Sequence, residues 1–166
     1  MRSGDLTGCQ DYASALALGR GAPVDVEAAK TLFQTTCNRG NQAACLSIAS
    51  MYLEGTFGVT QDLARGVALA SDACEHGNAN ACNAVATTYF DGFQATTKER
   101  GALLAAPYLE KACSGGSLRG CANLGQLYAV GLGVAFDQTR AQTLLKKACG
   151  GGIRAACDIL AKLGSP

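Results

Sequence analysis

The sequence predicts an all-α fold in which pairs of helices repeat along the chain as an α/α solenoid. Three observations support this prediction: a recurring cysteine frame, a helical pattern of apolar residues after each frame, and a composition poor in aromatic residues. Of the 166 residues, 48% are hydrophobic and only 6% are aromatic, with no tryptophan. A core made mainly of alanine, leucine, valine and cysteine favours closely packed helices over a β-sandwich.

The cysteine frame has the form C-x2-G-x4-C and occurs four times. The first copy is CNRGNQAAC, which begins at Cys37, and the later copies begin at Cys74, Cys113 and Cys149, at intervals of 37, 39 and 36 residues. A period of this length is typical of solenoid repeats. We therefore expect one array over residues 1–166. Its approximate units are 1–36, 37–73, 74–112 and 113–148, with a half-unit at 149–166.

The first helix of each unit is expected to follow the second cysteine of the frame. Small or apolar residues recur three, four and seven positions later, as Ile48, Ala49 and Tyr52 do after Cys45. This spacing places them on one face of a helix. A glycine, which adopts positive φ without strain, is then expected to end each helix. These glycines are Gly19, Gly55, Gly92 and Gly131.

The second helix is expected to run from a short loop to the next cysteine frame. Asp25, Asp62 and Asp137 occupy the N-cap position, where a carboxylate accepts a hydrogen bond from the first turn. Small residues eight positions before the cysteine would let two helices approach closely; they are Ala29, Gly66, Ala105 and Ala141. The whole pattern predicts about nine helices. A kink or break is expected just before Pro107, because proline removes a backbone hydrogen bond inside a helix.

The spacing within the frame indicates that its two cysteines lie on successive helices. On one straight helix they would be about 12 Å apart, whereas a disulfide requires Cα atoms within about 7 Å. One disulfide per repeat is therefore expected, each worth roughly 2–3 kcal/mol in the chain-entropy model. The residues concerned are Cys37, Cys45, Cys74, Cys82, Cys113, Cys121, Cys149 and Cys157. Metal binding and buried thiols remain alternatives, although zinc sites usually pair cysteines two to four residues apart.

The ninth cysteine, Cys9, corresponds to the second cysteine of an earlier pair, and the frame places its partner at Met1. Cys9 is thus expected to be unpaired. Three interpretations are open: the chain is cut from a longer array, Cys9 is a buried helix residue, or it is an exposed thiol that links two molecules. We expect truncation and a partly accessible thiol, in a chain that is otherwise monomeric.

Composition excludes several classes of partner. The net charge is +1 and no basic run stands out, so no nucleic-acid groove is expected. No run of 18 apolar residues exists, so membrane insertion is not expected. The N-terminus MRSGDLTGCQ lacks the apolar segment of a signal peptide. Because disulfides persist in oxidising compartments, we expect a periplasmic or secreted protein whose signal peptide is not in this chain.

The segments GVTQDLARGVALASDACEHGNANAC and LLKKACGGGIRAAC resemble Sel1-like repeats, which are related to tetratricopeptide repeats. With one cysteine pair per unit, the chain resembles the Helicobacter cysteine-rich protein family. The resemblance implies an extracytoplasmic solenoid that binds proteins or peptides. Some members of that family are described as penicillin-binding or β-lactamase-like, which gives the alternative function. The third unit departs from the pattern by lacking the GV loop, and the first unit by lacking its first cysteine.

No catalytic motif supports the alternative. No serine has a lysine three residues later, as serine β-lactamases require, and neither G-x-S-x-G nor H-E-x-x-H occurs. His76 is the only histidine, which excludes a multi-histidine metal site, and we interpret it as an exposed residue at a helix end. The prediction is a non-catalytic scaffold without cofactor or metal.

A partner is expected on the concave face, which the first helices line. The positions one, five, eight and nine after the second cysteine should face it. They include Ala17, Leu18, Leu53, Ala122, Ala129 and Val130, besides the binding candidates named at the end of this paragraph. Their mixture of apolar and amide or hydroxyl groups suits an extended peptide, although plain solvated surface is the alternative. The binding candidates are Gln10, Ser14, Leu46, Ser50, Glu54, Asn83, Thr87, Phe90, Asp91 and Gln126.

Overall fold

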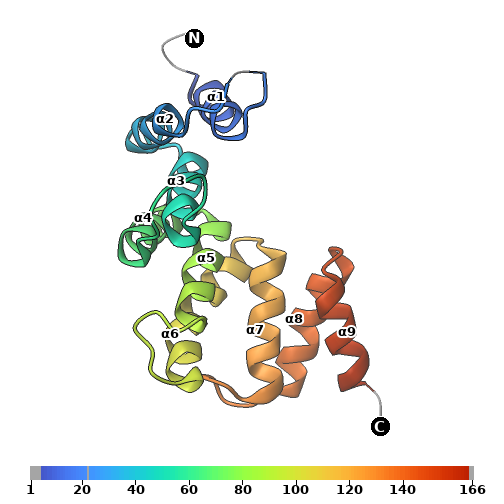
Figure 1. Ribbon diagram of the computed structural model, residues 1–166. Helices are drawn as coiled ribbons and strands as arrows, with labels where there is room; N and C mark the ends of the chain where they lie inside the picture. Colours follow the sequence, from blue (N-terminus) through green and yellow to red (C-terminus); the bar gives the residue numbers. More distant parts are fainter. Residues whose placement is uncertain (1–4, 22, 165–166) are drawn as a thin grey trace. The chain divides into compact units, whose positions relative to one another are not determined.

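The protein is all-α. The computed structural model describes residues 5–21 and 23–164, which contain nine helices and no strand (Figure 1). The chain divides into two compact units, Met1–His76 and Gly77–Pro166. The first unit contains α1 (Leu6–Leu18), α2 (Val26–Asn38), α3 (Gln42–Glu54) and α4 (Leu63–Glu75). The second contains α5 (Ala79–Phe90), α6 (Lys98–Ser114), α7 (Leu118–Val130), α8 (Gln138–Gly150) and α9 (Arg154–Leu163).

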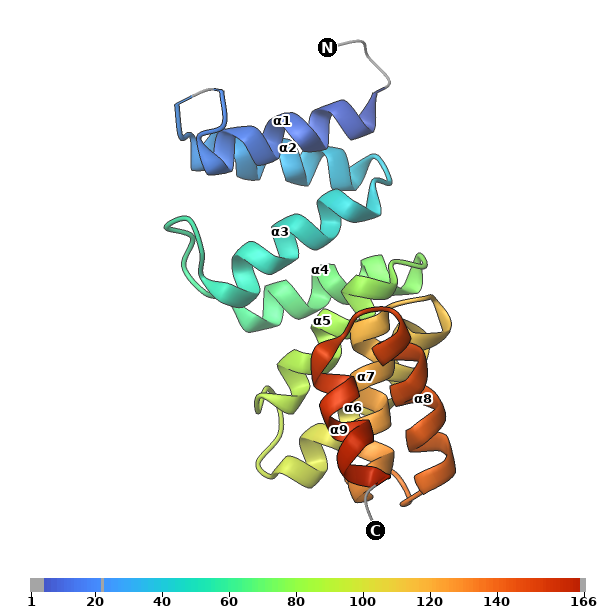
Figure 2. The ribbon, with the colours of Figure 1, turned by 90° about the vertical axis from the view of Figure 1, so that its right-hand side faces the viewer.

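In the first unit, each helix packs against the next one along the chain (Figure 2). The predicted positions after Cys45 form its core: Ile48 and Ala49 are almost completely buried, and Tyr52 is buried. Phe33 of α2 is also buried. Aliphatic burial of this kind contributes about 1.5–3 kcal/mol for each large side chain, so helix packing rather than helix propensity holds the unit together.

The predicted caps begin the second helices. Asp25, Asp62 and Asp137 each accept a hydrogen bond from the backbone N–H three residues later, over 2.9, 3.0 and 2.9 Å. The first helices have side-chain caps that were not predicted, at Asp5, Asn41, Asn78 and Ser117. Each of them also accepts from the residue three positions later, so both helices of a repeat start by the same mechanism.

Glycine ends three of the four first helices as predicted. Gly19, Gly55 and Gly131 adopt the left-handed conformation, with φ of 67°, 64° and 67°. The helix after Cys82 is the exception, because α5 ends at Phe90 and Asp91 takes the C-cap position. Gly92 follows with φ of 107°.

The predicted disulfides are confirmed as the joints between helices. Cys37–Cys45, Cys113–Cys121 and Cys149–Cys157 have Cα–Cα distances of 4.6, 4.5 and 4.8 Å. Cys74 and Cys82 are also disulfide-bonded. Each of these three pairs joins the end of one helix to the first turns of the next, because two cysteines eight residues apart on one straight helix would be about 12 Å apart, too far for a disulfide.

Cys9 differs from the expected accessible thiol. It lies on α1, it is only 9% exposed, and it is not in a disulfide. α1 packs against α2, and Cys9 occupies a buried position of α1 as a small apolar residue. Its expected partner position, Met1, lies outside the described residues.

The second unit contains the longest helix. α6 runs without interruption from Lys98 to Ser114, so a break before Pro107 is wrong, while the alternative of a kink stays a prediction. Pro107 and Leu103, whose carbonyl would otherwise accept the missing hydrogen bond, are both exposed. Water can satisfy that carbonyl, and the helix therefore continues through the proline.

The small residues before each frame are buried contact points. Ala29, Ala105 and Ala141 are fully buried, and a Cβ added to Gly66 would lie 3.0 Å from the backbone nitrogen of Leu53 on α3. These positions allow α3 and α4, and their counterparts, to approach closely. The bulkier residues five positions before the cysteine are half-buried, and they are Leu32, Leu69, Tyr108 and Leu144.

Candidate binding groove

The first helices of the second unit, α5 and α7, run in the same direction and are joined at their N-terminal ends. Ser117, the N-cap of α7, is 5% exposed. Its hydroxyl donates to Asn80 Oδ1 of α5 over 3.2 Å and accepts from the backbone N–H of Gly120 over 3.3 Å. One buried side chain thus starts α7 and fixes its register against α5.

A second hydrogen bond joins the middle of the two helices. Asn123 Nδ2 donates to Asn83 Oδ1 over 3.0 Å, and both side chains are half-buried. The bond uses the Asn83 carbonyl and one Asn123 amide hydrogen. The Asn83 amide group and the Asn123 carbonyl oxygen therefore keep hydrogen-bonding capacity at the surface between the helices.

Towards the C-terminal ends of α5 and α7 the surface opens into a pocket of about 170 Å³. Its floor consists of buried apolar residues, and its rim carries Phe90 and Val130, which are 40% and 65% exposed. α5, α6 and α7 all contribute residues to the pocket. The lining residues are Ala86, Thr87, Phe90, Asp91, Ala105, Leu109, Asn123, Gln126, Leu127, Val130 and Leu132. We call this surface, from Ser117 to the pocket, the α5–α7 groove.

The polar groups of the pocket are few. Thr87 Oγ1 donates to the backbone carbonyls of Ala84 and Asn83, over 2.9 and 3.2 Å, so its oxygen can only accept from a ligand. Asp91 and Gln126 are exposed at the rim. An apolar floor with a few convergent polar groups is the arrangement typical of ligand sites.

The structure thus brings together five predicted residues, with Thr87, Phe90, Asp91 and Gln126 around the pocket and Asn83 bonded to Asn123 beside it. Two expected groove positions are wrong: Ala17 and Ala122 are 6% and 8% exposed and belong to the core. Sequence reasoning missed Asn123. Asn123 precedes Gln126 by three residues and Val130 by seven. This spacing places it on the same helix face as those two expected positions, and could have identified it.

The other predicted residues lie in the first unit. Gln10 and Ser14 are on α1, where the Ser14 hydroxyl donates to the Gln10 carbonyl over 3.0 Å. Leu46 and Ser50 are half-buried on α3, and Glu54 is exposed at its end. Their role in binding stays a prediction.

Tyrosine–arginine pairs tie the two helices of a repeat together. The guanidinium carbon of Arg65 lies 4.4 Å from the ring centroid of Tyr52, and that of Arg140 lies 4.5 Å from the ring of Tyr128. The Tyr128 hydroxyl donates to Glu110 Oε1 over 3.3 Å. Burial raises the pKa of Tyr128; the Arg140 charge opposes the rise and Glu110 adds to it. Such contacts contribute about 0.5–1 kcal/mol each at exposed sites, which indicates a structural role.

Between α5 and α6, an aromatic cluster takes the place of this pair. The Tyr89 ring lies 5.8 Å from the rings of both Phe93 and Tyr108, measured between centroids. Burial raises the pKa of Tyr89, and the neighbouring Tyr108 adds to the rise. Both effects favour the neutral phenol, so the cluster packs as an uncharged contact between α5 and α6.

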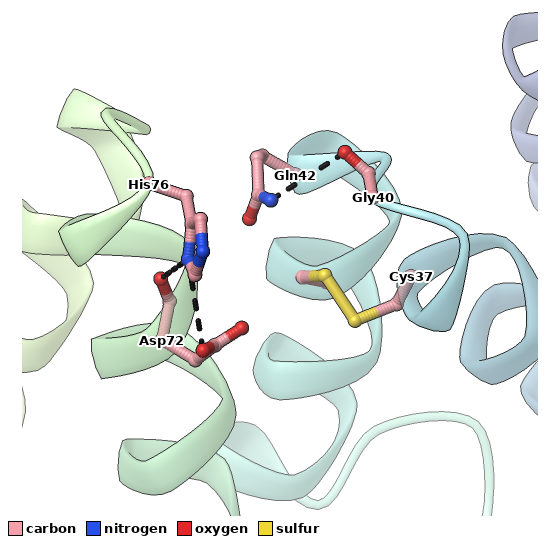
Figure 3. A network of polar contacts seen from close by, with 6 residues as sticks. Cys37, Gly40, Gln42, Asp72 and His76 are labelled. Atoms are coloured by element: carbon pink, nitrogen blue, oxygen red, sulfur yellow. Dashed lines mark hydrogen bonds and ion pairs between the residues drawn. A yellow bond between two sulfur atoms is a disulfide. The ribbon is translucent and has the colours of Figure 1, made fainter.

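His76 lies at a helix end, as expected. It is the C-cap of α4, and its Nδ1 atom is 2.8 Å from the Asp72 carbonyl and 3.6 Å from Asp72 Oδ1 (Figure 3). Nearby, Gln42 Nε2 donates to the Gly40 carbonyl over 3.4 Å. The histidine is exposed, which suits a helix-capping role.

The described residues contain no group of three or more histidine, cysteine, aspartate or glutamate side chains that could hold a metal ion. In the same part of the chain, no helix combines the length and the apolar character needed to cross a membrane.

Two amphibian proteins are similar in sequence. The chain is 31% identical over 130 residues to cytochrome c oxidase assembly factor 7 of Xenopus tropicalis, and 33% identical over 130 residues to cytochrome c oxidase assembly factor 7A of Xenopus laevis. Each match covers 77% of this chain and 56% of the relative. The chain therefore spans little more than half the length of these relatives.

Solved structures share the fold. A Sel1 repeat protein from Oxalobacter formigenes superposes with a TM-score of 0.85 at 23% identity, over 96% of this chain and 66% of that one. Cysteine-rich protein B of Helicobacter pylori superposes with a TM-score of 0.63 at 27% identity, over 82% of this chain and 96% of that one. The resemblance to the disulfide-rich Helicobacter proteins is confirmed.

The family assignment rests on four segments of the chain. Each of them matches the Sel1 repeat, and together they extend through both compact units. The matched segments are residues 8–41, 42–78, 79–117 and 118–152. With its helix pairs, its disulfide joints and these four matches, the chain belongs to the Sel1 repeat family.

Proposed function

We propose that this chain is a non-catalytic scaffold that binds an extended segment of a partner protein in the α5–α7 groove, as a monomer in the periplasm or outside the cell. Sel1 repeat scaffolds are typically protein-binding structures, and the disulfides indicate an oxidising environment. The names of the two Xenopus relatives describe assembly factors, and acting on other proteins is in keeping with this proposal.

The observation that carries the proposal is the pocket. Its volume of about 170 Å³ exceeds that of an apolar cavity of about 150 Å³ that accommodates benzene. One leucine- or phenylalanine-sized side chain therefore fits. The exposed ring of Phe90 and the exposed side chain of Val130 would be covered by such a side chain, which recovers about 25 cal/mol for each Å² of apolar surface removed from water.

The side-chain amides beside the pocket can bind the backbone of an extended peptide. An extended peptide presents unsatisfied backbone N–H and C=O groups on its way past an anchored side chain. Asn83 and Asn123 offer one donor group and one acceptor oxygen at half-buried positions. Gln126 offers both kinds of group at the rim.

The test is a selection from random 12-residue peptides displayed on phage, using the full oxidised chain. Val130→Arg places a bulky cation at the pocket rim and should reduce retention of the selected peptides by more than about tenfold. Leu103→Arg is the matched control, because Leu103 is 61% exposed and does not line the pocket. If wild-type protein enriches no peptide, or if both variants bind like wild type, the groove is not a peptide site.

The enzyme alternative has its own test. Hydrolysis of the chromogenic β-lactam nitrocefin by the purified oxidised chain should not exceed that of buffer. Turnover that follows the protein through purification would contradict a non-catalytic scaffold, irrespective of peptide binding.

A further inference from the structure

The α5–α7 groove carries opposite charges at its two ends. Within α5 and α7, Arg119 is the only charged side chain. It lies in the first turn of α7, where the helix is joined to α5 through Ser117 and Asn80. Asp91 follows directly after α5 and lies at the rim of the pocket, at the other end. Both side chains are exposed.

The helical period places these charges along one line. Arg119, Asn123, Gln126 and Val130 are separated by four, three and four residues, which is the spacing of one helix face. Asn80, Asn83 and Thr87 of α5 and Asp91, its C-cap, follow the same rule. The two faces meet, because Ser117 contacts Asn80, Asn123 contacts Asn83, and Val130 shares the pocket with Thr87 and Asp91.

We propose that the groove selects a peptide with an apolar side chain next to a basic one, and an acidic side chain about five residues away from the basic one. This inference rests on the proposed function and names its ligand class. The apolar side chain fills the pocket, the basic side chain lies beside Asp91, and the acidic side chain lies beside Arg119. The amides of Asn83 and Asn123 bind the backbone between them.

The expected separation follows from geometry. Eleven helical residues separate Arg119 from Val130, and at about 1.5 Å per residue this is roughly 16 Å. An extended peptide rises about 3.3 Å per residue, so about five residues cover the same length. The reach of the long arginine, lysine and glutamate side chains widens this to roughly four to six residues.

The two charges also determine which end of the groove takes the partner's basic side chain and which takes its acidic one. A basic group at the Arg119 end would meet a like charge without a compensating carboxylate on either helix. Like charges brought together oppose binding, whereas opposite charges at both ends favour one orientation. Since both charges are exposed, the attraction is screened by salt.

The experiment compares peptide pools selected by four proteins: the wild-type chain, Asp91→Asn, Arg119→Gln, and the charge-reversed double variant Asp91→Lys/Arg119→Glu. Wild type should enrich the apolar–basic pair with an acidic residue four to six positions away. Asp91→Asn should lose the basic preference and Arg119→Gln the acidic one. The double variant should enrich the reversed charges beside the same apolar anchor.

Affinity measurements on one selected peptide give the magnitude. Each single variant should bind it about two- to fivefold more weakly, the range of one exposed ion pair, and the difference should shrink in high salt. Asp158→Asn and Arg154→Gln, exposed residues of α9, are matched controls with the same changes of charge. These controls should bind like wild type, and circular dichroism should show all variants folded.

The outcomes separate the two proposals. No enrichment by any protein overturns both. Enriched peptides that fill the pocket but show no charge pattern, or Asp91→Asn behaving like Asp158→Asn, overturn the charge selection and leave the groove as a peptide site.

Discussion

At the scale of single residues, Phe57 is the least expected feature. It lies two residues after the capping Gly55, in the left-handed conformation with φ of 55°. The equivalent positions after Gly19 and Gly131 are Gly21 and Gly133, with φ of 76° and 67°. A side chain at positive φ is strained by roughly 1–2 kcal/mol, and Phe57 is 43% exposed, so nearly half of it is not packed against the protein.

We therefore expect Phe57→Gly to stabilise the chain by up to about 1 kcal/mol. Phe57→Ala is the control, because it removes the ring but keeps Cβ at positive φ. The glycine variant should have the higher urea midpoint of the two and should exceed wild type. A lower midpoint than wild type would mean that packing of the ring outweighs the backbone strain.

The burial of Cys9 gives a second prediction at this scale. Because Cys9 is 9% exposed on α1, its thiol should react with Ellman's reagent at least about tenfold more slowly in the native chain than in urea. Opening α1 from α2 must precede the reaction, so the rate should follow local unfolding. Cys9→Ser identifies the signal. Fast reaction of the native protein, together with disulfide-linked dimer, would instead show that the Cys9 thiol is accessible.

At the scale of elements, one loop packs directly against a neighbouring helix. Gly133, in the loop between α7 and α8, lies directly against α6. A Cβ at this position would be 2.5 Å from the backbone carbon of Ala102 and 2.5 Å from the nitrogen of Leu103. Gly152, between α8 and α9, also has positive φ, 90°, but a Cβ there would meet nothing within 4 Å.

This pair of glycines separates backbone strain from packing. Gly152→Ala should destabilise by about 1–2 kcal/mol through positive φ alone. Gly133→Ala should lose about 2–5 kcal/mol, because the clash with α6 adds an overpacking term of about 1–3 kcal/mol. Urea denaturation of both variants measures the difference. Equal losses would show that the loop is not held against α6 in solution.

At the scale of the whole molecule, the two compact units and the disulfides make stability a local property. Each helix packs mainly against its neighbours along the chain, and each disulfide closes a short loop between two of them. In such an array, stability is approximately a sum over repeats and their interfaces. The single-array organisation with the unit boundaries given above stays a prediction.

Removing one disulfide should therefore destabilise mainly the two helices that it joins. Cys37→Ala/Cys45→Ala should lower the local stability of α2 and α3 by about 2–3 kcal/mol and raise amide exchange there, while α7 and α8 keep their protection. Cys113→Ala/Cys121→Ala is the reciprocal variant and should affect α6 and α7. A uniform rise of exchange along the chain in either variant would contradict local stability.

What could be predicted from the sequence depends on short-range chemistry. The caps at Asp25, Asp62 and Asp137 and the glycine ends were predictable because each requires one residue type at one place. The disulfide joints followed from the reach of two cysteines eight residues apart. Helical periodicity alone placed Thr87, Phe90, Asp91 and Gln126 on the groove side of their helices, because the face of a helix is a local property.

The tertiary structure decided what lies opposite each face. It brought Asn123 to Asn83, buried Ala122 where a groove residue was expected, and joined α6 to the floor of the pocket through Ala105 and Leu109. It also kept α6 intact through Pro107, because that face is open to water. These results depend on how far one helix is rotated about its axis against the next. That rotation is determined by interlocking side chains from several repeats, so no single segment of sequence determines it.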